Sequence, residues 1–132
     1  MRLLLDTHIL LWVLGEPQRI APGIRRDIED LSNAVLISAV CAWEIATKHA
    51  IGKLPLPESP EALLDRAVAE LRGVELSISR RHALRSASLP PHHRDPFDRL
   101  LVAQALLEGA TLVTADPLLP VYGATLLWAG AR

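Results

Sequence analysis

The sequence predicts an α/β fold in which a central parallel sheet of four to five strands is flanked by helices on both faces. Short apolar segments alternate with longer segments of helical periodicity along the whole chain. Half of the 132 residues are hydrophobic, which suffices for one sizeable core. No internal repeat, low-complexity tract or linker interrupts the alternation. This pattern is typical of a parallel sheet between two helical layers, so we expect a single domain over residues 1–132.

The N-terminal part contains one strand and two helices. Arg2–Leu5 ends in three leucines followed by an aspartate, as expected of a short buried strand. Thr7–Leu14 is apolar and is followed by Gly15, which favours a helix that ends there. Pro22–Leu31 alternates charged and apolar residues at helical spacing, which predicts an amphipathic helix.

The middle of the chain repeats the order of strand and helices. Ala34–Ile37 is a second apolar strand, and Ser38 is a good N-cap for a helix that runs to about Ala50. After a proline-rich loop, Ser59-Pro60-Glu61 opens another helix, which ends near Gly73.

The C-terminal half supplies three strands and two helices. Val74–Ile78 is a third strand, and Ser79–Ala87 is a short helix with serine at its N-cap. Pro96–Glu108 is a strongly apolar helix with proline at its first position. Thr111–Val113 is a fourth strand, and Ala124–Leu127 is a possible fifth strand at an edge of the sheet.

Composition argues against a disulfide framework and against a membrane segment. The one cysteine, Cys41, is interpreted as a core residue. The longest apolar run, Leu3–Leu14, is interrupted by Asp6 and His8 and is shorter than the roughly 18 residues of a transmembrane helix. The N-terminus has no signal-peptide cleavage pattern. We therefore expect a cytoplasmic protein. Its mean hydropathy of +0.24 is high for a monomer, which indicates apolar surface covered by a second copy or another protein.

The net charge of −1 does not indicate a nucleic-acid-binding protein, but the charge is unevenly distributed. No acid occurs between Glu75 and Asp95, whereas arginines are frequent in and just after this segment. They are Arg80, Arg81, Arg85, Arg94 and Arg99. Arginine suits bidentate contacts with phosphate, although an ordinary solvated helix face would look the same.

Four segments bring acids to one edge of the predicted sheet. Asp6 directly follows the first strand, and Asp116 lies just past the fourth. Asp95 and Asp98 begin the helix that leads into the fourth strand. Because the carboxyl ends of parallel strands share one edge, these acids are expected to meet there. Each acid also has a structural interpretation as a helix cap, which is favoured for Asp95 and stays open for Asp116.

Glu44 fits a purely structural interpretation least well. Its helix is apolar nearly all round, so its carboxylate should be buried at a cost of several kcal/mol. A cation shared with the other acids would remove that cost, and so would an ion pair with Lys48 one turn later. Clustered carboxylates without cysteine favour Mg²⁺ or Mn²⁺, and the five histidines show no zinc-type spacing.

Five segments, in order and at domain-wide spacing, resemble PIN-domain ribonucleases and, within them, the VapC toxins of bacterial toxin–antitoxin pairs. They are Leu3–Trp12 (LLLDTHILLW), Ser38–Ala46 (SAVCAWEIA), Gly52–Leu54, Asp95–Ala105 and Leu112–Asp116 (LVTAD). The resemblance covers nearly the whole chain. It implies a PIN-like fold and RNA cleavage that depends on Mg²⁺ or Mn²⁺.

The resemblance also implies roles for particular residues and partners. The family's four acids fall on Asp6, Glu44, Asp98 and Asp116, Asp95 matches an extra acid, and Thr7 and Thr114 match hydroxyl positions beside the acids. The expected partners are an RNA substrate, a cognate antitoxin and a second copy in a homodimer. The RNA backbone would be held by the five arginines named above.

Two other classes of function remain to be weighed. A phosphate-transfer domain of the receiver or haloacid dehalogenase type also places an aspartate after its first strand. The dehalogenase pattern needs a second aspartate where this chain has His8, and the acids and lysine of a receiver are absent from the sequence. A non-catalytic RNA- or partner-binding module with the same fold stays the main alternative.

Overall fold

In the computed structural model, which describes residues 1–128, five strands form one parallel sheet in the order β3-β2-β1-β4-β5. The strands are β1 (Arg2–Leu5), β2 (Ala34–Ser38), β3 (Val74–Leu76), β4 (Thr111–Thr114) and β5 (Leu126–Trp128). The predicted α/β class and parallel sheet are therefore confirmed. Residues 129–132 of the expected domain lie outside the described residues.

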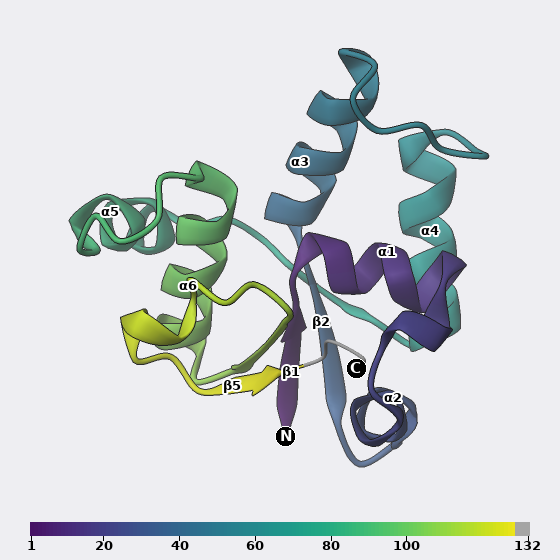
Figure 1. Cartoon of the computed structure of the whole chain (residues 1–132), viewed down its shortest axis with the longest axis horizontal. Coiled ribbons are helices and arrows are strands. Elements are labelled where there is room, and N and C mark those ends of the chain that lie inside the picture. Colours follow the sequence, from purple (N-terminus) through teal and green to yellow (C-terminus); the bar gives the residue numbers. More distant parts are fainter. Residues whose placement is uncertain (129–132) are drawn as a thin grey trace.

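Helices cover both faces of the sheet. They are α1 (Thr7–Gly15), α2 (Pro22–Glu29), α3 (Ala39–Ala50), α4 (Pro60–Leu71), α5 (Arg80–Ser88) and α6 (Pro96–Glu108), with short 3₁₀ turns η1 (Pro17–Arg19) and η2 (Pro120–Tyr122). Figure 1 shows α5 and α6 on one side of β1 and β2, and α1, α2 and α4 on the other. The helices change from one face of the sheet to the other because the chain adds β2 and β3 on one side of β1 and then adds β4 on its other side.

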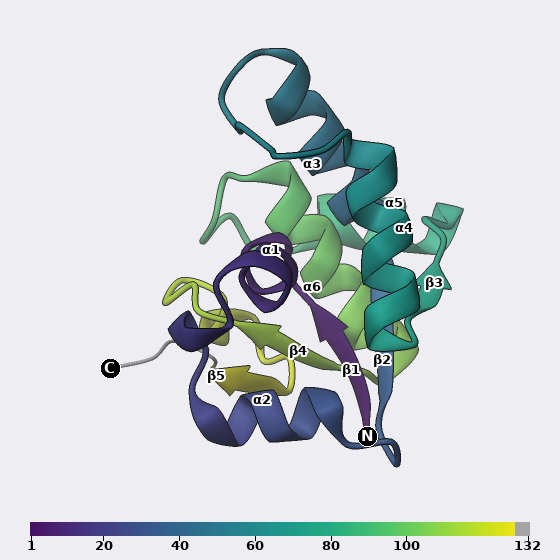
Figure 2. The same cartoon turned by 90° about the vertical axis from the view of Figure 1, so that its right-hand side faces the viewer.

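The two central strands lie in the middle of the core. Leu4 in β1 pairs with Leu36 in β2 and with Leu112 in β4, and all three side chains are buried. Figure 2 shows β1, β4 and β5 side by side, with β5 at the edge as expected. Cys41 is fully buried, which agrees with its interpretation as a core residue. Within residues 1–128, no helix has the length and apolarity that crossing a membrane requires.

Three predicted boundaries were wrong by two residues. The strand expected over 124–127 begins only at Leu126, which pairs with Leu112 in β4. The helix expected over 22–31 ends at Glu29, because the Asp30 carboxylate accepts hydrogen bonds from the backbone N–H and hydroxyl of Ser32 and forms a turn. The strand expected over 74–78 ends at Leu76, which pairs with Ser38, the last residue of β2. Beyond this point β3 has no partner strand.

Candidate active site

The site lies where the strand order reverses. β1 and β4 are neighbours in the sheet. The chain first adds β2 and β3 on one side of β1, and then adds β4 and β5 on its other side. In open α/β sheets such a switch point leaves a crevice at the carboxyl ends of the strands. Asp6 follows β1 and Asp116 lies two residues beyond β4. Helix α6 begins at the same end of the sheet, the upper end in Figure 1, and brings Asp98.

Asp6 is both a helix cap and a buried acid. Its Oδ1 accepts a hydrogen bond from the Ile9 N–H at 2.9 Å, which caps α1. Its Oδ2 accepts from the Thr114 hydroxyl, so the last residue of β4 holds the carboxylate that follows β1. Burial raises the pKa of Asp6 above its ordinary value. The capping interpretation of Asp6 is therefore confirmed. The charged form of its carboxyl is disfavoured in the folded protein because the group is buried.

Asp95 and Asp98 divide two tasks at the start of α6. Asp95 Oδ1 accepts from the backbone N–H groups of Phe97 and Asp98, at 2.8 and 3.2 Å, as expected of an N-cap. Asp98 is on the first turn, with its side chain 21% exposed. Burial raises the pKa of Asp98 to about 7, and the negative charges of Asp95 and Glu44 act in the same direction.

Asp116 meets Asp98 through a histidine that sequence reasoning missed. The Nε2 atom of His93 lies 2.9 Å from Asp116 Oδ2 and 3.0 Å from Asp98 Oδ2. The potential ligand atoms of these three residues all lie within 4.8 Å of one another. His93 belongs to the loop over residues 89–95 that leads into α6, so the loop's position at the carboxyl edge was the one available signal.

The carboxylate of Glu44 contacts two other side chains. The Thr7 hydroxyl donates to Oε1 at 2.6 Å, and Lys48 pairs with Oε2. The side chain is only 4% exposed, so the expected burial is confirmed and the alternative ion pair with Lys48 is present. Glu44 still acts electrostatically at the site, because its negative charge raises the pKa of both Asp6 and Asp98.

The acids line a hollow whose chemistry suits a hard cation. Asp6, Asp98 and Asp116 share this hollow of about 190 Å³ with His8, Trp12 and Ala115. Two of the three carboxyls have raised pKa values because burial destabilises their charged forms. A divalent cation with oxygen ligands would relieve that cost, so the donor set fits Mg²⁺ or Mn²⁺.

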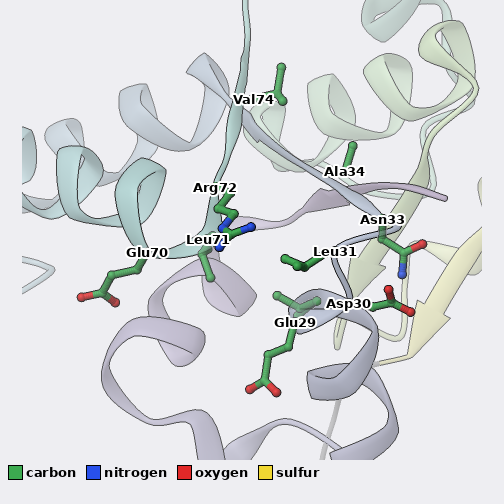
Figure 3. A pocket seen from close by; sticks show the side chains of 10 residues that line it. Glu29, Asp30, Leu31, Asn33, Ala34, Glu70, Leu71, Arg72 and Val74 are labelled. Carbon is green, nitrogen blue, oxygen red and sulfur yellow. The ribbon is translucent and has the colours of Figure 1, made fainter.

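A larger hollow, of about 320 Å³, lies at the opposite end of the sheet (Figure 3). It is lined by the end of α2, by Leu71 at the end of α4 and Arg72 just after it, and by the first residues of β2 and β3, Ala34 and Val74. Because ligands in open α/β sheets bind at the carboxyl ends of strands, this amino-end hollow is not the candidate site.

The predicted RNA-contacting arginines fall into two groups. Arg80, Arg81 and Arg85 (the α5 arginines) and Arg94 are exposed. Arg99 is instead used inside the chain. Its guanidinium donates to backbone carbonyls of Ser86, Leu89, Pro90 and His93, at distances between 2.8 and 3.2 Å. Arg99 thus fixes the 89–95 loop. A cation on the first turn of a helix opposes the helix dipole, which could have signalled such a structural role.

The sequence of this chain is similar to those of known proteins. The PIN domain profile matches residues 3–123. Ribonuclease VapC22 of Mycobacterium tuberculosis is 29% identical over 115 residues, which cover 86% of this chain and 85% of the relative. Ribonuclease VapC16 of the same organism is 37% identical over 68 residues, which cover 51% of this chain and 48% of the relative.

Solved structures share the fold at low sequence identity. A chain of VapBC2 from Rickettsia felis, bound to a promoter DNA fragment, matches with a TM-score of 0.74 at 20% identity, over 98% of this chain and 99% of that one. A chain of DNA-bound VapBC from Salmonella typhimurium matches with a TM-score of 0.70 at 18% identity, over 96% and 97% of the two chains.

Proposed function

The chain belongs to the PIN domain family, and on this premise we propose that it is a divalent-metal-dependent endoribonuclease and the toxin of a type II toxin–antitoxin pair. The observation that carries the proposal is the convergence of Asp6, Asp98 and Asp116 from three separate segments on one hollow at the β1–β4 switch point. The curated relatives that match are both named ribonucleases, which supports the same activity.

In this proposal the ion is held by Asp6, Asp98 and Asp116, with Glu44 as the fourth acid of the set. When bound, a divalent ion would stabilise negative charge on phosphoryl oxygens and lower the pKa of a water molecule. The chain's own residues orient the acids. Thr114 fixes the Asp6 carboxylate, Thr7 fixes that of Glu44, and the Asp95 cap sets where α6 begins and hence where Asp98 points.

We propose that the exposed arginines on the α5–α6 side of the molecule contact the phosphates of the RNA backbone. The α5 arginines and Arg94 are exposed, so phosphate contacts are open to them. Such contacts would make RNA affinity depend on salt concentration. Arg99 is left out of this role, because its donors are taken by the 89–95 loop and its neighbours.

We also propose an antitoxin and a second copy as protein partners. Trp43, Ile51 and Leu118 are each at least half exposed. Trp43 packs edge-on against Phe97 at the start of α6, so this exposed aromatic side chain lies near the acidic site. A segment of antitoxin lying over Trp43 would cover the site together with this apolar group.

Cleavage of RNA by purified protein tests the nuclease assignment. With Mn²⁺ and a panel of structured RNAs, we expect wild-type protein to leave 5′-phosphate and 3′-hydroxyl ends. Asp6→Asn and Asp98→Asn should each abolish cleavage, while Asp65→Asn, an exposed acid on α4, should leave it unchanged. Undiminished cleavage by both site variants would remove the carboxylate assignment. RNA binding without cleavage by the wild type would favour the non-catalytic module.

A further inference from the structure

The imidazole of His93 stands between two of the proposed metal-holding carboxylates. Nε2 lies 3.0 Å from Asp98 Oδ2 and 2.9 Å from Asp116 Oδ2, so one nitrogen contacts both acids. The His93 side chain is 13% exposed, and the ring is thus largely enclosed. A cation that bridges Asp98 and Asp116 through these two oxygens would compete with the ring for them.

Backbone hydrogen bonding fixes which nitrogen of the ring carries the proton. The N–H of Asp95 donates to His93 Nδ1 at 3.2 Å, so Nδ1 must be the bare, accepting nitrogen. In a neutral imidazole the proton is then on Nε2, where it points at the two carboxylates. A ring in this tautomer is a donor to Asp98 and Asp116. It offers no lone pair at Nε2 with which to bind a metal ion.

The backbone at His93 is anchored independently of the ring. Its N–H donates to the Tyr122 hydroxyl at 2.7 Å, and its carbonyl accepts from Arg99 at 3.2 Å. The ring itself is held by the two carboxylates and the Asp95 N–H. Rotation of the side chain would therefore release the carboxylates and the Asp95 N–H, while the backbone N–H and carbonyl of His93 keep their hydrogen bonds.

We infer that His93 is an internal competitor of the divalent cation: its ring occupies the space between Asp98 and Asp116 in the metal-free protein and is displaced when the ion binds. This inference rests on the metal site of the proposed function. An ion that binds Asp98 Oδ2 and Asp116 Oδ2 would replace the ring N–H at both oxygens, so its binding would break the ring's contacts. The apparent affinity for the ion is lowered by the fraction of molecules in which the ring is in place.

Mn²⁺ titration at one fixed pH, followed by the EPR signal of the free ion, tests the competition without measuring activity. Removing the ring's contacts with the two carboxylates should lower the Kd of His93→Ala about tenfold relative to wild type. His92→Ala, its exposed neighbour in the same loop, should bind as wild type does. Asp98→Asn should bind weakly, because it removes a proposed ligand.

The outcomes separate the inference from the function on which it rests. An unchanged or higher Kd for His93→Ala, with normal binding by wild type, overturns the competitor role and leaves the metal site in place. A higher Kd would indicate a histidine ligand. If neither wild type nor His93→Ala binds Mn²⁺, the proposed metal site fails, and the inference fails with it.

Ring ¹⁵N NMR of the wild-type protein gives a second readout, which follows the ring itself and does not depend on the metal affinity of a variant. Metal-free protein should show a His93 ring whose Nδ1 carries no proton, and Mg²⁺ saturation should move it to the averaged signals of an exposed imidazole. His93→Gln serves only to assign the signals. Signals that stay unchanged at saturation, or a proton that moves to Nδ1 as ligation through Nε2 requires, would both contradict displacement.

Discussion

Replacing Asp98 by asparagine should stabilise the metal-free protein at high pH, although it removes a charged group near a helix N-terminus. Burial raises the pKa of Asp98 from 3.8 to about 7, so the folded state holds a proton that the unfolded chain has lost between these values. Stability of the wild type should therefore fall as pH rises through this window and level off above about pH 7. Asp98→Asn lacks this dependence.

The size of the effect follows from the same interval. One pH unit corresponds to about 1.4 kcal/mol, so the whole interval would cost about 4 kcal/mol. The Asp98 side chain is 21% exposed, and solvent screens its neighbours, so we expect about half of this cost, or about 2 kcal/mol. Asp98→Asn should thus be about 2 kcal/mol more stable than wild type at pH 8, with little difference near pH 4.

Urea denaturation followed by tryptophan fluorescence, with a chelator present and at several pH values, measures this difference. Asp65→Asn, which removes an exposed carboxylate on α4, should show no comparable trend. Added Mg²⁺ should stabilise wild type more than Asp98→Asn, because binding to the folded state adds to its stability. A variant less stable than wild type at pH 8, or a difference that does not vary with pH, would refute the reasoning.

The remaining predictions concern the loop, the cap and the RNA contacts. Arg99→Lys should lose about 3 kcal/mol of unfolding free energy in urea, because lysine cannot reach the same set of carbonyls; Arg94→Ala should lose almost nothing, and equal losses would contradict the anchoring role. Asp95→Ala should cost about 1 kcal/mol through the lost cap and weaken Mn²⁺ binding less than Asp98→Asn does, whereas an equal loss of affinity would make Asp95 a ligand. Joint replacement of the α5 arginines by alanine should weaken RNA binding and flatten its salt dependence in filter-binding assays; an unchanged slope would place the phosphate contacts elsewhere.

Local patterns predicted most of the fold. The helix over 96–108 matches to the residue, because proline at its first position, the Asp95 cap and Gly109 at its end all act within a few residues. The predicted ends of helices and strands were wrong where a contact that the hydrophobic pattern does not show ends the element. The helix ending at Glu29 was shortened by a turn of Asp30 with Ser32, and β3 ends where its partner strand ends.

The sequence predicted which acids lie at the candidate site, but it did not predict which side chains contact them. Asp6 and Asp116 follow strands, so the parallel sheet alone brings them to one edge. That Glu44 pairs with Lys48 was one of two open alternatives. The placing of Arg99 among carbonyls and of His93 between two acids was not foreseen, because neither contact follows a helical or strand repeat.

The sequence by itself therefore determined the elements, their caps and the edge of the sheet that carries the acids, since these depend on residues near one another in the chain. Only the tertiary structure decided which oxygen faces which donor. The Thr114 hydroxyl on Asp6, the raised pKa of Asp98 and the ring of His93 between Asp98 and Asp116 all depend on segments brought together at the β1–β4 switch point. Burial and the distances between side chains set these properties, and neither is encoded in the spacing of residues along the chain.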